Sequence, residues 1–394
     1  MYINPETIKA NRTPFYYYDL ALLENTLKEL TSNSKKYGYH VHYAFKANTN
    51  QPIIDLVHEY GLGADCVSGN EVHLAINSNF ASDQIVFAGA GKTDEEIAYA
   101  LSNDIFCFNC ESIQEIQVIN EIAEDLGKIT NIAIRINPNV DAGTHKYITT
   151  GLDENKFGIG IHQLPEMLEV VSNSKNLNLD GIHFHIGSQI TKMYVFRELC
   201  AKINSINNWF EDQGVCLNHV NVGGGLGIDY DHPELNPIPD FKEFFGLFDK
   251  FLNLKKGQQL HFELGRSVVG QCGSLLTRVL YVKDGLQTKF VICDAGMTEL
   301  LRPALYQAKH KIENLSSVFT DKDKYDVVGP ICESSDCFAK GLELPITQRG
   351  DAIMIQSAGA YGEVMSSQYN LRTKAKAFYT ERDKKSNAIP LIKM

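Results

Sequence analysis

The sequence predicts an α/β protein in which a TIM-like (β/α)8 barrel is followed by a mainly β domain. Three observations lead to this prediction. Eight short β-branched or aromatic runs recur through the first two thirds of the chain, most of them separated by stretches long enough for a helix. After about Ser267 strand follows strand. Polar residues stand at the ends of the runs, where a parallel barrel places its reactive groups.

The elements of the barrel are justified in chain order by their residue patterns. The expected strands are residues 40–45, 63–67, 84–88, 105–108, 131–136, 181–186, 219–222 and 259–263. Apolar residues at three- and four-residue spacing predict helices over residues 52–60, 112–126 and 196–213. Thr93, followed by three acidic residues, predicts a capped helix start. The pattern alone leaves an open, doubly wound sheet as an alternative.

The second domain is predicted from strands without long helices between them. The expected strands are residues 275–282, 289–293, 325–328, 352–356 and 376–379, and residues 14–18 are expected to add another. Residues 229–240 and 321–324 have the proline, glycine and charge of surface loops. We therefore expect the barrel over residues 22–267 and the β domain over residues 1–21 and 268–394.

Composition favours a small-molecule enzyme. Of the 394 residues, 44% are hydrophobic and 22% charged, as in ordinary globular proteins. The net charge of -11 argues against nucleic acid or an anionic membrane as partner. No apolar run approaches the roughly 20 residues that span a bilayer, and the N-terminus lacks the features of a signal peptide. We expect a cytoplasmic protein.

The nine cysteines predict reduced thiols, because their number is odd and their spacing shows no repeating pairs. Cys107 and Cys110 form a CxxC pair, but the second pair that a structural zinc site needs is missing. We therefore expect no metal.

The polar residues at four strand ends are informative as a group. Alone, Lys46 could be a capping residue, His185 a core histidine, Glu263 one half of an ion pair, and the glycines from Gly223 to Gly225 a tight turn. Together they meet the separate needs of pyridoxal phosphate. The lysine suits covalent attachment, the glycine amides the phosphate, the imidazole stacking on the ring, and the carboxylate the ring nitrogen. The sequence thus predicts this cofactor.

Nine short motifs, in order, give the chain a resemblance to a known family. They are YAFKAN at Tyr43, GLGADCVSGNE at Gly61, KFGI at Lys156, HIGSQ at His185, GGGLG at Gly223, ELGRS at Glu263, RPALY at Arg302, GPICESSD at Gly329 and GAYG at Gly359. From Pro14 to Leu371 the chain resembles the fold-type III pyridoxal-phosphate decarboxylases. One departure is Leu264, where relatives usually have proline; this removes no functional group.

The resemblance implies roles for the matching residues. Lys46 would attach the cofactor, His185 would stack on it and Glu263 would pair with its ring nitrogen. The other cofactor-binding residues would be Ser188, Gly223, Gly224, Gly225, Gly265, Arg266 and Tyr361. The substrate-binding residues would be Arg266, Arg302, Tyr306, Glu333 and Tyr361. Cys332 would protonate the carbanion carbon, with Lys46 as the alternative donor.

The resemblance also implies a partner. In relatives the cysteine and glutamate that match Cys332 and Glu333 come from the second subunit. We therefore expect an obligate homodimer with shared active sites.

Arg302 and Glu333 favour a substrate whose far end has both a carboxylate and an ammonium group. The implied reaction is the decarboxylation of meso-2,6-diaminopimelate to L-lysine and carbon dioxide, the last step of lysine biosynthesis. Decarboxylation of ornithine, arginine or carboxynorspermidine is the alternative. Arg302 could instead form an interface ion pair, and Cys332 could be an inert buried thiol.

Two further classes of protein are alternatives to a decarboxylase. An alanine racemase-like enzyme would favour a cation facing the ring nitrogen, whereas the candidate here is Glu263. A pseudoenzyme that binds the cofactor without turnover would not need Lys46, Cys332 and Glu333.

Overall fold

The computed structural model describes residues 8, 10–140, 156–380 and 391–393, and the chain divides into two compact units. The barrel unit comprises Leu27–Gly227 and Asp240–Gly265. The β unit comprises Met1–Thr26, Ile228–Pro239 and Arg266–Met394. The expected domain limits, with the barrel over residues 22–267 and the β domain over residues 1–21 and 268–394, stay a prediction.

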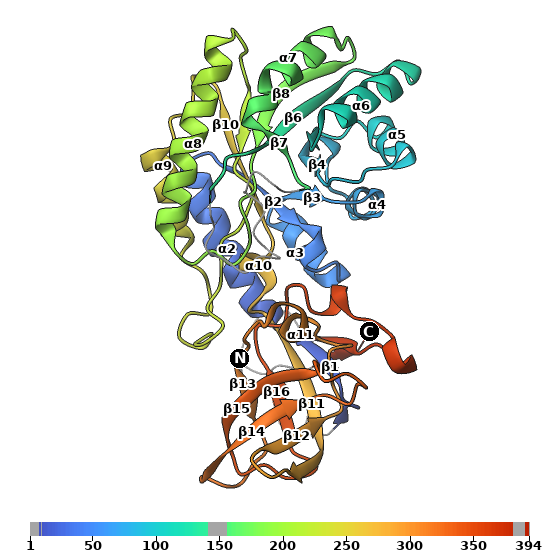
Figure 1. Ribbon diagram of the computed structural model, residues 1–394, viewed down its shortest axis with the longest axis vertical. Helices are drawn as coiled ribbons and strands as arrows, with labels where there is room; N and C mark the ends of the chain where they lie inside the picture. Colours follow the sequence, from blue (N-terminus) through green and yellow to red (C-terminus); the bar gives the residue numbers. More distant parts are fainter. Residues whose placement is uncertain (1–7, 9, 141–155, 381–390, 394) are drawn as a thin grey trace. The chain divides into compact units, whose positions relative to one another are not determined.

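The barrel unit is a closed parallel barrel (Figure 1). Its strands are β2 (His40–Ala44), β3 (Gly63–Cys66), β4 (Ile85–Phe87), β5 (Cys107–Cys110), β6 (Thr130–Asn137), β8 (Leu177–His183), β9 (His219–Asn221) and β10 (Gln259–Leu264). Neighbours run β5-β4-β3-β2-β10-β9-β8-β6, and pairing of β5 with β6 closes the ring. The short β7 (Ile159–Gly160) pairs with β6 outside the ring. The eight predicted strands are confirmed, and the alternative of an open, doubly wound sheet is wrong.

Helices lie around the barrel strands (Figure 1). They are α2 (Leu20–Lys36), α3 (Gln51–Glu59), α4 (Gly69–Asn77), α5 (Asp94–Ser102), α6 (Ile113–Asp125), α7 (Leu164–Asn173), α8 (Met193–Asp212) and α9 (Phe241–Phe251). The predicted start of α5 is confirmed, because the Thr93 side chain accepts from the Glu96 amide and the Glu96 carboxylate accepts from the Thr93 amide. Helix α8 begins three residues before the predicted start at residue 196.

The β unit is built on a mixed nine-stranded sheet. Its strands are β1 (Phe15–Tyr18), β11 (Gly273–Asp284), β12 (Lys289–Cys293), β13 (Ile312–Asn314), β14 (Lys322–Val328), β15 (Cys337–Pro345), β16 (Ala352–Ile355), β17 (Lys376–Thr380) and β18 (Leu391–Lys393). Strand β1 lies between β11, which is antiparallel to it, and β17, which is parallel. The predicted strands of this domain are confirmed.

The prediction of a loop over residues 321–324 is wrong, because β14 begins at Lys322. Its first three side chains are exposed or half-buried, so the charge that indicated a loop lies on the solvent-facing part of a strand. Short helical segments complete the chain: α10 (Arg266–Val269), α11 (Arg302–Tyr306), and the 3-10 turns η1 (Phe45–Ala47), η2 (Ser82–Gln84), η3 (Ile161–Gln163), η4 (Glu363–Met365) and η5 (Tyr369–Leu371).

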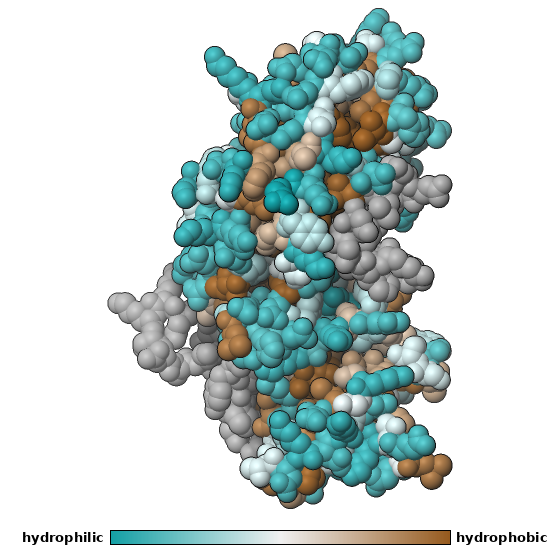
Figure 2. Space-filling model, turned by 60° about the vertical axis from the view of Figure 1, so that its left-hand side comes forward, coloured by the Kyte–Doolittle hydropathy of each residue, from teal (hydrophilic) through white to brown (hydrophobic). Residues whose placement is uncertain are grey.

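The surface is mixed in character. On the face shown in Figure 2, hydrophobic residues lie in separate small patches among hydrophilic ones. In the part of the chain that the structure describes, no helix combines the length and the apolar character needed to cross a bilayer. The nine cysteines are all free thiols.

A cluster of histidine rings lies at the N-terminal ends of the barrel strands. The rings of His40, His42 and His219 lie 4.6, 5.2 and 5.0 Å from that of His261. His42 Nδ1 lies 3.1 Å from the Gln84 carbonyl and therefore donates to it, which leaves Nε2 to accept from His261 Nδ1 at 2.9 Å. Burial lowers the pKa of His42 to about 4, and burial also lowers the pKa of His261.

This cluster makes stability depend on pH. The unfolded chain protonates His42 below about pH 6.5, whereas the folded chain keeps it neutral to about pH 4, so stability is lost as pH falls through that window. Between about pH 7 and pH 5 the loss from His42 is about 2 kcal/mol. In urea unfolding, His42→Gln is expected to reduce the pH dependence by that amount, and His58→Gln, at an exposed position, to leave it unchanged. Equal pH dependence in wild type and His42→Gln would contradict the assignment.

Candidate active site

Lys46 lies in η1, directly after strand β2, between the buried residues Phe45 and Ala47. Its Nζ donates to Asp65 Oδ2 at 2.9 Å, and its side chain is 36% exposed whereas that of Asp65 is 0% exposed. The other oxygen of Asp65 is buried without a hydrogen-bond partner. Burial and the nearby Glu263 raise the pKa of Asp65, and Lys46 opposes them. The end of the barrel therefore holds an amine beside a carboxylate that can take up a proton.

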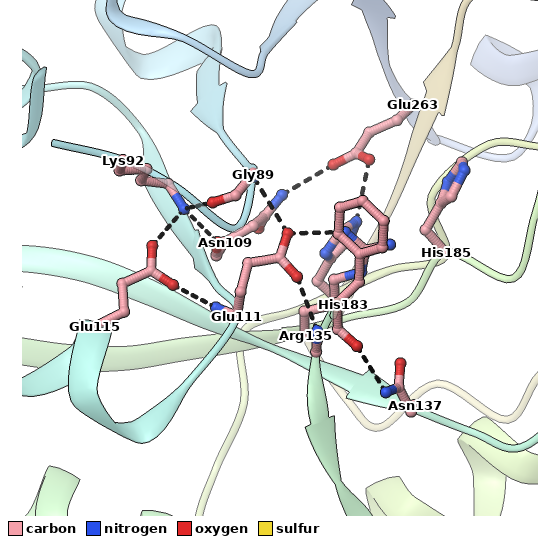
Figure 3. A network of polar contacts seen from close by, with 12 residues as sticks. Gly89, Lys92, Asn109, Glu111, Glu115, Arg135, Asn137, His183, His185 and Glu263 are labelled. Carbon is pink, nitrogen blue, oxygen red and sulfur yellow. Dashed lines mark hydrogen bonds and ion pairs between the residues drawn. The ribbon is translucent and has the colours of Figure 1, made fainter. Parts of the chain in front are cut away.

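Glu263 lies near the end of β10 and is held by residues from three other strands. Its Oε2 accepts from His183 Nε2 at 3.0 Å, and its Oε1 accepts from Asn109 Nδ2 at 2.9 Å and Asn221 Nδ2 at 2.8 Å. Burial opposes ionisation, but His183 and Lys46 nearby lower the pKa of Glu263 below its ordinary value. Glu263 is thus a fixed, buried carboxylate (Figure 3).

His185 follows β8 and lies beside the glycine run. Its Nδ1 accepts from the Gly224 amide at 3.3 Å, so this nitrogen is unprotonated. Burial, with the positive charges of Arg135 and Lys46, lowers the pKa of His185 well below its ordinary value. His185 therefore presents a neutral imidazole ring at the end of the barrel. An uncharged ring of this kind can stack on the face of a flat ligand.

The glycine run packs against the backbone of neighbouring strands. A Cβ on Gly223 would lie 2.2 Å from the Phe184 carbonyl oxygen, and one on Gly224 would lie 2.0 Å from that of Glu263. Gly223 and Gly225 also have φ values of 68° and 105°, which favour glycine. The tight turn considered for this run is present, and the run brings backbone amides to the end of β9.

A second polar network supports the first (Figure 3). Arg135 Nη1 donates to Glu111 Oε1 at 2.8 Å, and both side chains are buried. Lys92 Nζ donates to the carbonyl oxygens of Gly89 and Asn109, both at 2.9 Å. The backbone of Asn109 is thereby fixed while its side chain holds Glu263, so the outer network sets the direction in which the Glu263 carboxylate points.

The residues at the barrel end fit pyridoxal phosphate. They offer an amine, an ionised carboxylate, a neutral imidazole and glycine amides, which are the groups that the cofactor uses. Buried polar atoms without a partner add capacity for a polar ligand: Asp65 Oδ1, Asn109 Oδ1 and His183 Nδ1. Among the described residues, no group of three or more histidine, cysteine or acidic side chains is arranged to hold a metal ion.

In the β unit, two predicted substrate-binding arginines lie in one cluster, which we call the arginine cluster: Tyr230, Arg266, Arg302, His310 and Tyr361. Arg266 Nη1 donates to the Tyr230 hydroxyl at 2.6 Å, and Arg302 Nη1 donates to His310 Nε2 at 2.9 Å. The guanidinium carbons of Arg302 and Arg266 lie 4.9 Å from the ring centroids of Tyr230 and Tyr361, respectively.

Arg302 is a buried cation held by neutral groups. It is 3% exposed, and its Nε has no hydrogen-bond partner. Within the described ranges, no carboxylate lies at ion-pair distance from it. The interface ion pair considered for Arg302 is therefore not formed in this part of the chain, and the cluster is suited to an anion.

Cys332 and Glu333 lie on an exposed segment of the β unit. The Cys332 amide donates to Asn370 Oδ1 at 3.1 Å, and Glu333 Oε1 accepts from the Tyr369 hydroxyl at 2.9 Å. Turn η5, which contains both Tyr369 and Asn370, therefore fixes this segment. The alternative that Cys332 is an inert buried thiol is wrong, because the side chain is at the surface of the single chain.

Three further predicted site residues lie close in sequence to His185, Glu263 and Arg302. Ser188 is half-buried after β8, Gly265 is buried between β10 and α10, and Tyr306 is half-buried at the end of α11. Tyr361 has a left-handed backbone, with φ of 56°. Strain of this kind is common at functional sites.

Sequence reasoning missed several polar residues of the site: Asp65, Asn109, Glu111, Arg135, His183, Asn221, Tyr230 and His310. Most of them stand at or just after the end of a buried barrel strand. A polar residue in an otherwise apolar strand was therefore the available signal. Tyr230 and His310 lie in irregular segments and carry no such signal.

The barrel and its polar strand ends define a class, the pyridoxal-phosphate enzymes of the barrel type. Comparison with known families agrees with this class: the family described as "Pyridoxal-dependent decarboxylase, pyridoxal binding domain" matches residues 22–270. Diaminopimelate decarboxylase of Bacteroides thetaiotaomicron is 52% identical over 377 residues, which cover 95% of this chain and 97% of that protein. The corresponding protein of Aquifex aeolicus is 41% identical over 92% of this chain and 85% of its own length.

Solved structures give the same result. A crystal structure of diaminopimelate decarboxylase from Helicobacter pylori complexed with L-lysine has a TM-score of 0.89 and 39% identity, and the match covers 98% of this chain and 95% of that one. The chain belongs to the diaminopimelate decarboxylase family of pyridoxal-dependent decarboxylases.

Proposed function

We propose that this protein decarboxylates meso-2,6-diaminopimelate to L-lysine and carbon dioxide, with pyridoxal phosphate attached to Lys46. The observation that carries the proposal is the 52% identity, over nearly the full length of both chains, to a diaminopimelate decarboxylase. In this proposal, the barrel of residues 22–267 binds the cofactor and the β domain recognises the substrate. Decarboxylation of ornithine, arginine or carboxynorspermidine is not favoured, because the relatives named above share the diaminopimelate activity.

The chemistry of the barrel residues supports this proposal. Bound pyridoxal phosphate supplies an electron sink for the electron pair left by the departing carboxylate. Glu263, ionised and held by three donors, would keep the ring nitrogen protonated. His185, being neutral, would cover one face of the ring without adding charge. Asp65, 2.9 Å from Lys46 Nζ, would hold the amine and take up its proton.

The residues of the β unit support the choice of substrate. Arg302 is a buried guanidinium without a carboxylate partner among the described residues, and we assign it to the distal carboxylate. Arg266, Tyr306 and Tyr361 would assist it. Glu333 would bind the distal ammonium group, which ornithine also has, so Arg302 is the residue that distinguishes the two substrates.

We further propose an obligate homodimer in which Cys332 and Glu333 serve the active site of the other subunit. Cys332 is exposed in the single chain although a proton donor to a carbanion must be shielded from water. A second copy would supply that shielding. We also place the protein in the cytoplasm, in keeping with nine free thiols.

The activity is tested in a bacterial strain that lacks its own diaminopimelate decarboxylase. Expression of the wild-type chain is expected to restore growth without lysine, and expression of Lys46→Ala is not. Two results would refute the proposed function. One is growth of the strain that expresses Lys46→Ala. The other is no growth of the strain that expresses the wild-type chain, although the chain is produced as soluble protein.

The shared site is tested by mixing two inactive variants. Lys46→Ala and Cys332→Ala chains, each inactive alone, are expected to regain about a quarter of wild-type activity after joint refolding, because half of the dimers combine both chains and hold one intact site each. Each variant refolded alone is the control. No recovery, with mixed dimers demonstrated by mass spectrometry, would show that each site belongs to one chain.

A further inference from the structure

A cavity of about 1040 Å³ in the β unit is lined by an excess of positive side chains. We call it the cation pocket and define it by Arg12, Arg278, Arg372, Lys374 and Lys376. Phe15 of β1 pairs with Leu276 of β11 and with Lys376 of β17, so the segment that leads into β1 runs between the strands that carry Arg278 and Lys376. In a chain of net charge -11, such a concentration of cations needs a cause.

Asp294, the one carboxylate among the described residues that line the pocket, does not neutralise these cations. Asp294 Oδ2 accepts from Thr13 Oγ1 at 2.5 Å, and its Oδ1 accepts from Thr277 Oγ1 at 2.7 Å and from the Arg278 amide at 2.9 Å. Its oxygens therefore tie neighbouring strands together. Across residues 10–140, 156–380 and the other described positions, none of the five cations lies within ion-pair distance of a carboxylate.

Two guanidinium groups of the pocket are held by neutral carbonyl oxygens. Arg278 donates to the carbonyls of Gly350 at 3.2 Å and Ile8 at 3.1 Å. Arg372 donates to the backbone carbonyl of Asp294 at 2.6 Å, and its Nε is buried without a hydrogen-bond partner. These contacts fix the planar groups without an ion pair among the described residues, and the nearby Glu299 and Asp336 offset part of the charge of Arg372. The positive charge that remains preorganises the pocket for an anion.

The pocket also has apolar walls. Phe378, Leu280 and Pro14 line it, and Leu371 at its edge is 99% exposed. The pocket, of about 1040 Å³ and open to solvent, is much larger than an inorganic phosphate needs and slightly exceeds the roughly 300–1,000 Å³ that is usual for organic ligands. The ligand that suits this surface has several negative charges for the cations and an apolar part for the walls.

We propose that the cation pocket binds an organic polyphosphate, of which a nucleoside triphosphate is the type. Five cations suit the charge of a polyphosphate better than that of a dicarboxylate, and the apolar walls suit a base or sugar. The proposal does not depend on the decarboxylation reaction. It is an additional binding site, formed by residues that we have not assigned to catalysis.

The proposal is tested by titration calorimetry on the cofactor-loaded protein with ATP, inorganic phosphate and adenosine, in the absence of divalent cations. ATP is expected to bind with a Kd below about 1 mM, and phosphate and adenosine at least about tenfold more weakly. Arg12→Glu and Lys374→Glu, both at exposed positions, are each expected to weaken ATP binding about tenfold or more. Lys283→Glu, an equal charge change at an exposed position of the same sheet outside the pocket, is expected to leave it unchanged.

Four results would overturn the proposal. The first is no ATP binding to the wild-type protein, and the second is equal weakening by Lys283→Glu. The third is phosphate binding as tight as ATP binding, which would indicate a simple anion site. The fourth is dissociation of the subunits by Arg12→Glu or Lys374→Glu in sedimentation experiments, which would make this face a contact between copies of the chain.

Discussion

Lys46→Ala is expected to abolish decarboxylation, with a loss of about 10³-fold or more in kcat, the order of magnitude associated with removal of a catalytic group. Without the amine, the cofactor would lose the covalent attachment that we propose, and the proton carried by Nζ would be lost. The fold is expected to survive, because burial raises the pKa of Asp65, which can become neutral once its partner is gone. The measurement is steady-state release of carbon dioxide, with thermal melting to verify folding.

A matched control separates attachment from general effects of charge. Lys35→Ala removes an exposed lysine at the end of α2 in the same unit and is expected to retain wild-type activity. Borohydride reduction of the cofactor-loaded wild-type protein, followed by peptide mass spectrometry, is expected to place the cofactor on Lys46. Attachment to another lysine would show that the amine at the end of β2 has a different role.

Arg302→Met is expected to lower kcat/KM for meso-2,6-diaminopimelate by about 10- to 150-fold, which corresponds to the loss of a charge-assisted hydrogen bond of about 1.5–3 kcal/mol. Methionine keeps most of the volume beside Tyr230, whose ring lies 4.9 Å from the guanidinium. Because Arg302 is assigned to the far end of the substrate, cofactor loading is expected to stay unchanged. The preference for diaminopimelate over ornithine is expected to shrink by the same factor.

Arg302→Lys provides the conservative comparison. It keeps the positive charge but loses the bidentate hydrogen-bond donor, so we expect a kcat/KM between those of the wild type and Arg302→Met. If Arg302→Met retained both the wild-type kcat/KM and the wild-type preference, Arg302 would be a structural residue that holds His310 and Tyr230 in place.

The fold was predictable because the barrel strands differ strongly from the segments around them. Most are short runs rich in apolar residues, and the helices between them show regular apolar spacing, as in α6 and α8. The β unit was harder to predict. The prediction lacks strands β13, β15 and β18, and it starts β14 three residues late. In β13, β14 and β15, polar residues at half-buried or exposed positions resemble a loop.

The site was predictable in part. Lys46 and Glu263 stand out as charged residues at the ends of apolar strands, and the resemblance to a known family assigned their roles. The hydrogen bonds of Glu263 to Asn109 and Asn221 were not predictable, because the three residues come from strands separated by up to 154 positions. His310 was missed for a different reason. It follows Arg302 by only eight residues, but it lies in an irregular segment where no pattern indicates that its ring accepts from Arg302 and contacts the Gln356 carbonyl.

The account is tested most directly by the substrate preference of the purified, cofactor-loaded protein. Incubated separately with meso-2,6-diaminopimelate, ornithine, arginine and carboxynorspermidine, it is expected to release carbon dioxide efficiently from the first alone and to form L-lysine in equal amount. Faster release from any of the other three would contradict the role of Arg302, and no release from any of the four compounds would contradict the decarboxylase activity itself.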